Sequence, residues 1–497
     1  MRIFMLGWEF PPFLAGGLGT ACHGLTKSLA QQGHEVLFVL PQTVPDDLKT
    51  HVQLMGPNTL KARAGQIHHR ASVGAPAPAP VGVVGVHAEP EQDQPGPASS
   101  EQPAGDGAGS GEGVARPVGD VRSHPYPGVD FGDTLTRVVD RLNAASGVTK
   151  PVARAERFDA LRSSSASDLA AAMDEVLGSL EDMGTRDGGY GGDLFGDAQR
   201  YAGLVAALGV HERFDVIHAH DWLTYPAGLA LRALTGKPLV VHIHATEFDR
   251  SGDHVNQQVY NIERAGLNGA DRVIAVSRLT KSIVHRRYGV PENRIDVVYN
   301  GVDQDSVQPK RGMAIERDEK IVLFLGRITM QKGPEYFIRA AKRVLEKEDK
   351  VKFVVAGSGD MAVRMIEEAA DLGIGHKVLF TGFLRGRDVD RVFRMADCYV
   401  MPSVSEPFGI APLEAMRNDV PVIVSRQSGV SEVLTHCLKV DFWDTDDMAN
   451  KIVAVLRYPP LSQTLREQGR FELRGLGWDG AAEKTVRSYA RAIASKA

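Results

Sequence analysis

Two basic residues, Arg327 and Lys332, stand five positions apart in the segment GRITMQKG, at 326–333. The segment follows KIVLFLG (320–326), an apolar run of the kind that forms a buried strand. A guanidinium supplies a fork of N–H donors and an ammonium supplies a compact charge, so the pair could neutralise a diphosphate. A solvated pair is the alternative, but the position between a buried strand and a helix favours a function.

Two carboxylates, Glu406 and Glu414, stand eight positions apart in SEPFGIAPLEAM (405–416), behind a strand-like run at 398–402. A carboxylate at the end of a strand can accept both hydroxyls of a ribose or a hexose. Backbone N–H groups at 409–411, where a helix begins, can bind further hydroxyls or phosphate. A helix cap with a solvated acid would explain Glu406, but it explains poorly why Glu414 interrupts an apolar sequence.

Glycines Gly16 and Gly17 open the segment GGLG, which lies between an apolar run at 2–8 and a helical pattern at 20–32. Glycines let the backbone approach a phosphate, and a helix N-terminus offers unpaired N–H donors to it. A tight turn between strand and helix fits the same residues. The segment is not GxGxxG, so it does not predict a nicotinamide dinucleotide site.

Two pairs of histidines also end strand-like runs, His218 and His220 in HAHDW and His242 and His244 in HIH. Imidazole is a common metal ligand, which makes a metal cluster conceivable. No carboxylate or thiol completes a ligand set in the sequence, so we expect no metal here.

Strand-like and helical patterns alternate on both sides of these motifs. Strand, glycine-rich loop, helix and strand at 2–41 form a βαβ unit, which implies a parallel sheet. The alternation resumes at 214 and starts afresh at 320. We therefore predict an α/β protein with two Rossmann-like, doubly wound domains that face a cleft. Each motif follows a strand, so all of them should lie at that cleft.

The predicted domains are 1–304, 305–475 and a final helix at 476–497, whose apolar stripe should return to the first domain. Ala, Gly and Pro fill 27 of the 50 positions from 71 to 120. Such a composition cannot bury enough apolar surface to fold, so about 70–128 is predicted to be a disordered insertion. Polar-rich helical patterns at 131–210 predict accessory helices.

Composition excludes several classes of protein. The net charge of −5 gives no electrostatic reason to bind nucleic acid. No apolar run approaches the roughly 18 residues that a transmembrane helix needs. The three cysteines form no CxxC pair, and the first residues lack the pattern of a secretory signal. We expect a cytoplasmic protein.

Taken in order, WEFPPFLAGGLG, HAHDW, GR-x4-KG and SEPFGIAPLEAM resemble the retaining glycosyltransferases of the GT-B fold. Within them the chain most resembles the glycogen and starch synthase type and the related group 1 family with the same E-x7-E signature. The resemblance covers about 1–42 and 212–497. In the synthases a Lys-x step commonly precedes the two glycines, whereas this chain has Leu14 and Ala15.

The resemblance implies a nucleotide-sugar donor and a role for several residues toward it. Gly16 and Gly17 would contact the donor diphosphate from the first domain, and Arg327 and Lys332 would bind it from the second. His220 would lie against the donor sugar near the reacting carbon.

It further implies that Glu406 holds a hydroxyl of the donor sugar, helped by backbone groups of Gly409 and Ile410. Glu414 would bind the ribose hydroxyls, and the loop around Phe383 would form the base pocket.

The implied reaction is the retaining transfer of a hexosyl unit, glucosyl first of all, from ADP- or UDP-glucose to a glycan, as in α-1,4-glucan elongation. A GT-B enzyme that transfers mannose or glucose to a lipid or a small glycoside is the alternative. A silent sugar-nucleotide-binding protein is a third reading, which the intact motifs disfavour. No cofactor is implied, because the nucleotide sugar is a substrate. No divalent metal is required, because the two cations can stabilise the departing diphosphate.

Overall fold

The computed structural model describes residues 1–13, 16–45, 47–72, 173–174, 176–180, 193–303 and 318–496. Nearly all of the insertion predicted at about 70–128 lies outside these residues, as does much of the 131–210 region. Leu14 and Ala15 also lie outside them.

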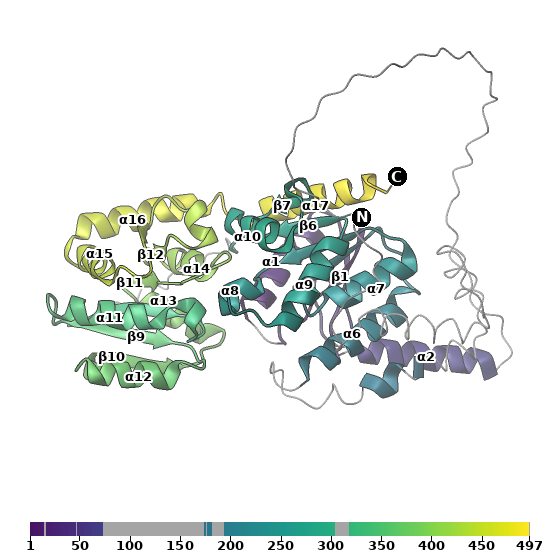
Figure 1. The fold of residues 1–497 in the computed structure, drawn as a ribbon, viewed down its shortest axis with the longest axis horizontal. Coiled ribbons are helices and arrows are strands. Elements are labelled where there is room, and N and C mark those ends of the chain that lie inside the picture. The colour runs from purple at the N-terminus through teal and green to yellow at the C-terminus, as the bar shows by residue number, and fades with distance from the viewer. Residues whose placement is uncertain are drawn as a thin grey trace, which may run out of the picture.

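The first domain is built on a seven-stranded sheet in which every strand pair is parallel, with the order β3-β2-β1-β4-β5-β6-β7 (Figure 1). The strands are β1 (Arg2–Leu6), β2 (Glu35–Val39), β3 (Gln53–Met55), β4 (Val216–His220), β5 (Leu239–Ile243), β6 (Arg272–Ala275) and β7 (Ile295–Val297). The helices are α1 (Gly17–Gln31), α2 (Pro57–Ser72), α6 (Leu194–Gly209), α7 (Tyr225–Thr235), α8 (Glu247–Ser251), α9 (Gln257–Gly269) and α10 (Arg278–Tyr288).

The second domain has a six-stranded parallel sheet with the order β10-β9-β8-β11-β12-β13. Its strands are β8 (Lys320–Leu325), β9 (Val351–Ala356), β10 (Val378–Gly382), β11 (Cys398–Met401), β12 (Val422–Ser425) and β13 (Leu438–Val440). Its helices are α11 (Pro334–Leu345), α12 (Ala362–Asp371), α13 (Arg387–Met395), α14 (Ala411–Arg417), α15 (Thr445–Arg457) and α16 (Pro459–Leu473), with short 3₁₀ turns η3 (Met330–Lys332) and η5 (Gly429–Glu432). The predicted fold of two doubly wound α/β domains is confirmed.

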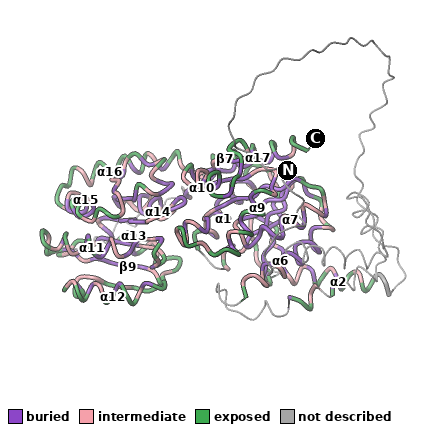
Figure 2. Tube along the Cα trace, in the orientation of Figure 1, coloured by how far each residue is buried: buried purple, intermediate pink, exposed green. Residues whose placement is uncertain are grey.

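Central strands are buried on both faces, which explains their continuous apolar runs. All five residues of β4 and of β5 are buried, and separate apolar cores cover the two sides of the first sheet. Figure 2 shows that buried residues gather in the interior of each domain. Helix α6, at the end of the region predicted to hold accessory helices, belongs to one of these cores. Its Tyr201 is fully buried and donates a hydrogen bond to the carbonyl oxygen of Val39 over 2.8 Å.

The last helix, α17 (Trp478–Ala494), packs on the first domain, against α1 and the face of β5 and β6 (Figure 1). The ring of Trp478 lies over Gly24 of α1, and Ser28 of α1 donates to Asp479 over 2.6 Å. Just before this helix the chain runs beside the end of the first domain, where the amide of Val302 donates to Leu476 over 3.0 Å. The first domain is therefore made of two distant stretches of sequence.

None of the helices in the described ranges combines the length and the apolar character needed to cross a bilayer.

The contact of Gly24 with Trp478 can be tested by adding one methyl group. A Cβ at Gly24 would lie 2.2 Å from the indole ring, so Gly24→Ala should lower the free energy of unfolding by about 1–3 kcal/mol through overpacking. This loss would exceed the gain of about 1 kcal/mol in helix propensity.

The matched control is Gly65→Ala in α2, where a Cβ meets nothing within 4 Å and the propensity gain should appear alone. Urea unfolding measures both variants. Equal stabilisation by the two substitutions would contradict the packing of α17 on α1.

Candidate active site

The basic loop of the second domain lies directly against the end of β11. Gly333, which follows η3, has a φ of 63°, and a Cβ there would come within 2.2 Å of the carbonyl oxygen of Pro402. Only glycine fits both the conformation and the space. The close approach brings Lys332 beside the residues that follow β11.

An ion pair joins the basic loop to the acidic motif. Nζ of Lys332 donates to Oε2 of Glu406 over 2.5 Å, and the hydroxyl of Ser403 donates to the same oxygen over 3.1 Å. The amide of Val404 donates to the carbonyl of Gln331 over 3.0 Å. Glu406 is only 7% exposed, so the loss of either charged partner would leave the other charge poorly compensated.

The guanidinium of Arg327 has N–H donors available to bind an anion. Within the described residues its guanidinium has one side-chain contact, at 3.5 Å from Oε1 of Gln331, which is too long for a strong hydrogen bond. The side chain is exposed at the carboxyl end of β8. The fork of Arg327 and the ammonium of Lys332 thus lie on one short loop, where both can meet a diphosphate.

Glu414 lies in the first turn of α14, behind Gly409 and Ile410. Burial raises the pKa of its carboxyl, while the charge of Arg417 lowers it. No side chain of the described part of the chain hydrogen-bonds this carboxylate. Gly409 has a φ of 100°, which favours glycine at the turn that aims the helix. A half-buried carboxylate without a side-chain donor can accept two hydroxyls of a ligand.

Phe383 follows β10 at the same edge of the sheet and is 57% exposed. The guanidinium of Arg385 lies 5.3 Å from the centre of its ring. An exposed aromatic ring is suited to stack on a nucleobase.

Gly16 caps α1 at the facing edge of the first sheet, but a side chain that the sequence analysis did not single out lies there too. Oε2 of Glu9 accepts a hydrogen bond from the amide of Gly19 over 3.3 Å, and a Cβ at Gly16 would lie 2.8 Å from that oxygen. Glu9 therefore already stabilises the positive end of α1. The only sequence signal was an acid between Trp8 and two prolines.

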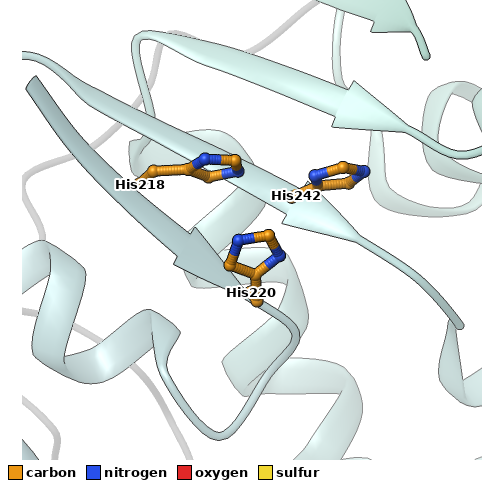
Figure 3. Close-up of side chains that lie close together, drawn as sticks. All are labelled: His218, His220 and His242. Carbon is orange, nitrogen blue, oxygen red and sulfur yellow. The ribbon is translucent and has the colours of Figure 1, made fainter. Parts of the chain in front are cut away.

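The histidines form a stack on the face of the first sheet that α17 covers. His218 and His220 come from β4 and His242 comes from β5, and their rings lie close together (Figure 3). Nδ1 of His218 lies 2.7 Å from the hydroxyl of Tyr489, and Nδ1 of His220 lies 2.9 Å from Nε2 of His244. No described group hydrogen-bonds Nε2 of His220.

His218, His220 and His242 are also the residues that could hold a metal ion, because their ligand nitrogens lie within 4.8 Å of one another. In a tetrahedral zinc site, bonds of about 2.1 Å place two nitrogens only about 3.4 Å apart. Rings that spread as far as 4.8 Å would have to move together to bind one ion. The arrangement favours a stack of neutral rings, and the expected lack of a metal stays a prediction.

Burial lowers the pKa of the stacked histidines, to about 3 for His218 and for His244. The rings are therefore neutral at physiological pH. Asp221 follows His220 and has a φ of 57°. Burial raises the pKa of its carboxyl to about 6, although the amide of His244 donates a hydrogen bond to it over 2.7 Å, which lowers the pKa.

The two edges that carry the predicted residues face one another. Ile410 of the second domain packs against the apolar core of the first, and the hydroxyl of Ser405 donates to Oδ1 of Asp249 over 2.5 Å. Among the predicted residues, the side chains of Lys332 and Glu406 are hydrogen-bonded to each other, and the amide of Glu414 donates to the carbonyl of Ile410. All of them lie at these two edges, with Arg327, Lys332, Phe383, Glu406, Gly409, Ile410 and Glu414 on the second sheet and Gly16, Gly17 and His220 on the first.

Three family models match the chain. Residues 309–471 match glycosyl transferases group 1, 190–306 match glycosyltransferase family 4, and 2–84 match the starch synthase catalytic domain. An uncharacterized glycosyltransferase of Methanocaldococcus jannaschii is 34% identical over 57% of this chain and 77% of its own length. A D-inositol 3-phosphate glycosyltransferase of Mycobacteroides abscessus is 29% identical over 59% of this chain and 70% of its own.

Solved structures share the fold at low sequence identity. Sucrose-phosphate synthase of Thermosynechococcus elongatus has a TM-score of 0.61 and 17% identity over 99% of each chain. HepE of Anabaena, solved in complex with UDP and glucose, has a TM-score of 0.58 and 15% identity, also over 99% of each chain.

Acid should destabilise the first domain through the histidine stack. An unfolded histidine titrates near pH 6.5, whereas the folded rings of His218 and His244 do so near pH 3, so the unfolded chain takes up protons first as the pH falls. Their stabilisation is complete above about pH 6.5 and is lost toward pH 3, by up to about 1.4 kcal/mol per pH unit for each ring. Asp221 opposes this trend, because its raised pKa makes the folded state bind a proton near pH 6.

Urea unfolding between pH 7.5 and pH 5 measures the net slope. The slope should shrink in His218→Asn and stay unchanged in His254→Asn, which alters an exposed histidine outside the stack. The same slope in His218→Asn as in the unaltered protein would show that the ring is not held neutral.

Proposed function

Because the chain belongs to the group 1 glycosyltransferases and has the GT-B fold, we propose that it transfers a hexosyl unit from a nucleotide sugar to a glycan with retention at the anomeric carbon. The observation that carries this proposal is the Lys332–Glu406 ion pair beside Arg327, at the carboxyl ends of β8 and β11. It combines cations for a diphosphate with a carboxylate for a sugar hydroxyl.

The second domain holds the donor. The guanidinium of Arg327 binds the diphosphate with two N–H donors, and the ammonium of Lys332 interacts with both Glu406 and the diphosphate. Glu406 then has an oxygen available for a hydroxyl of the sugar, and the backbone of Gly409 and Ile410 helps. This assignment is supported by the 2.5 Å contact, which sets the ammonium and the carboxylate side by side.

The nucleoside occupies the same edge of the second sheet. Glu414 accepts the ribose hydroxyls, a role supported by its burial and by the lack of a donor from the described side chains. The base lies at Phe383, whose exposed ring offers it a surface for stacking.

The first domain closes over the sugar. His220 lies against it, a role supported by its unpartnered Nε2, since a buried nitrogen without a partner favours a ligand hydroxyl. Gly16 and Gly17 offer backbone amides at the start of α1 to the diphosphate.

Transfer takes place on the front face of the donor. Inversion would need a carboxylate base on the opposite face, and two-step retention would need a carboxylate nucleophile near the reacting carbon. Glu406 and Glu414 have other roles, so the departing diphosphate itself takes the proton of the acceptor. Arg327 and Lys332 stabilise its charge, so the reaction needs neither a divalent metal nor a cofactor.

A glucan that grows by α-1,4 linkage is the acceptor we propose first, with ADP- or UDP-glucose as donor. The match of residues 2–84 to the starch synthase catalytic domain supports it. A small phosphorylated polyol is the second candidate, because relatives at 27–30% identity are D-inositol 3-phosphate glycosyltransferases.

Donor binding should appear as thermal stabilisation. A ligand present at 100 times its Kd raises the free energy of unfolding by about 2.7 kcal/mol, so ADP-glucose or UDP-glucose should raise the Tm clearly. Turnover is then measured with maltoheptaose and, separately, with D-inositol 3-phosphate, and NMR of the product gives its anomeric configuration. If no sugar nucleotide stabilises the protein or is turned over, the proposed function fails.

Loss of the ammonium at the diphosphate should cost turnover, and the charge left unpaired on Glu406 should lower stability as well. Lys332→Ala should lower kcat by about 10²–10³, the scale expected for one preorganised charge-stabilising donor. Lys320→Ala is the control, since this lysine lies at the opposite end of β8 and should leave kcat unchanged. Turnover of Lys332→Ala at the level of the unaltered enzyme, with saturating donor, would remove Lys332 from the mechanism.

A further inference from the structure

A short hydrogen bond joins the first residue of the acidic motif to the first domain. The hydroxyl of Ser405, in the second domain, donates to Oδ1 of Asp249, in α8 of the first domain, over 2.5 Å. Asp249 is only 2% exposed, and its partner precedes Glu406 by one residue. A hydrogen bond to a buried carboxylate belongs to the stronger class of such bonds.

The carboxylate of Asp249 is fixed before the second domain reaches it. Its other oxygen, Oδ2, accepts hydrogen bonds from the amide and the hydroxyl of Thr246 over 2.8 Å and 2.7 Å. The bond from the Thr246 amide and a bond from the amide of Asp249 to the hydroxyl of Thr246 form the capping box of α8. The remaining oxygen is thereby held toward Ser405. The first domain thus presents a preset acceptor at the cleft.

A buried ionic network holds α8 itself in place. Arg250 pairs with Glu247 and Glu263, and it also donates to the carbonyl of Ala245 over 3.1 Å. The hydroxyl of Tyr288 donates to Glu263 from α10. The short helix is thus anchored to the body of the first domain and cannot follow the second domain if the cleft opens.

On the other side, the segment of Ser405 is part of the ion-paired loop. Val404 is bonded through its amide to Gln331, and Glu406 is bonded to Lys332. A contact that fixes the position of Ser405 therefore also restrains the carboxylate of Glu406, the next residue. The domains touch again where Glu432 accepts hydrogen bonds from the amides of Arg278 and Leu279, and where the hydroxyl of Thr280 donates to the carbonyl of Pro407 over 3.4 Å.

We propose that Asp249 and Ser405 form a clasp between the domains that positions Glu406 for the donor sugar when the cleft is closed. Both are positioning residues, since they act through Glu406. We expect the clasp to separate when the cleft opens and to form again on closure. The inference rests on the proposed function for the role of Glu406, and on the hydrogen bond between Ser405 and Asp249 for the clasp.

Ser405→Ala tests the clasp, because it removes one hydroxyl and leaves the capping box of Asp249 intact. With sugar nucleotide and acceptor, kcat should fall about tenfold, the loss expected for one hydrogen bond to a charged group. The Kd of the free nucleoside diphosphate should stay within twofold, because the side chains proposed to bind it, Arg327, Lys332 and Glu414, lie on the second domain and do not contact Ser405. Ser405→Thr keeps a hydroxyl and should restore most of the activity.

The matched control is Ser431→Ala, whose hydroxyl donates only to carbonyls of its own domain, those of Arg426 and Ser428. It should leave kcat unchanged. Full activity of Ser405→Ala, or an equal loss in Ser405→Ala and Ser405→Thr, would overturn the positioning role.

A distance measurement tests the clasp without turnover. The three native cysteines are buried, so spin labels can be attached at Ala265→Cys in α9 and Glu367→Cys in α12, both exposed. In Ser405→Ala the distance between the labels should lengthen or broaden relative to the same labelled pair with Ser405. An unchanged distribution would overturn the clasp. If no sugar nucleotide is turned over by any variant, the proposed function fails, while this distance still decides on the clasp.

Discussion

The direction of the strands governs where chemistry can occur in this protein. In a parallel sheet every strand points the same way, so the loops that follow the strands collect at one edge. Both sheets are wholly parallel, and their loop-bearing edges face one another. This single constraint brings side chains that are far apart in sequence, such as Lys332 and Glu406, to one edge of a sheet.

Much of this arrangement could be predicted from the sequence, because parallel strands have a plain signature. Continuous apolar runs such as KIVLFLG predict a strand buried on both faces, and a motif that follows the run is thereby placed at an edge. This reasoning located Arg327, Lys332, Glu406 and Glu414 on one side of the second domain. It could not predict that Lys332 donates to Glu406, because that contact depends on the close approach of Gly333 to Pro402.

Contacts between elements without a local pattern escaped prediction. Glu9 reaches the amide of Gly19 because the chain turns back on itself after β1, and Ser405 meets Asp249 because two domains meet. Neither contact leaves a periodic trace in the sequence. Helix α6 is a different case, since its residues AGLVAAL are apolar enough to predict burial. Because the residues before them are polar, the sequence pattern places this helix among the accessory helices instead.

The return of α17 to the first domain also affects how the protein is made. A ribosome releases the chain from its N-terminus onward, and domains generally fold as units during synthesis. Helix α1 packs on the same face of the sheet as α17, but until Trp478 and Tyr489 have emerged the contacts of α17 with β5 and β6 on that face are missing. The second domain, which lies between the two parts of the first, can therefore reach its native state earlier. Of these two domains, the one whose synthesis starts first is thus the one that we expect to complete its fold last.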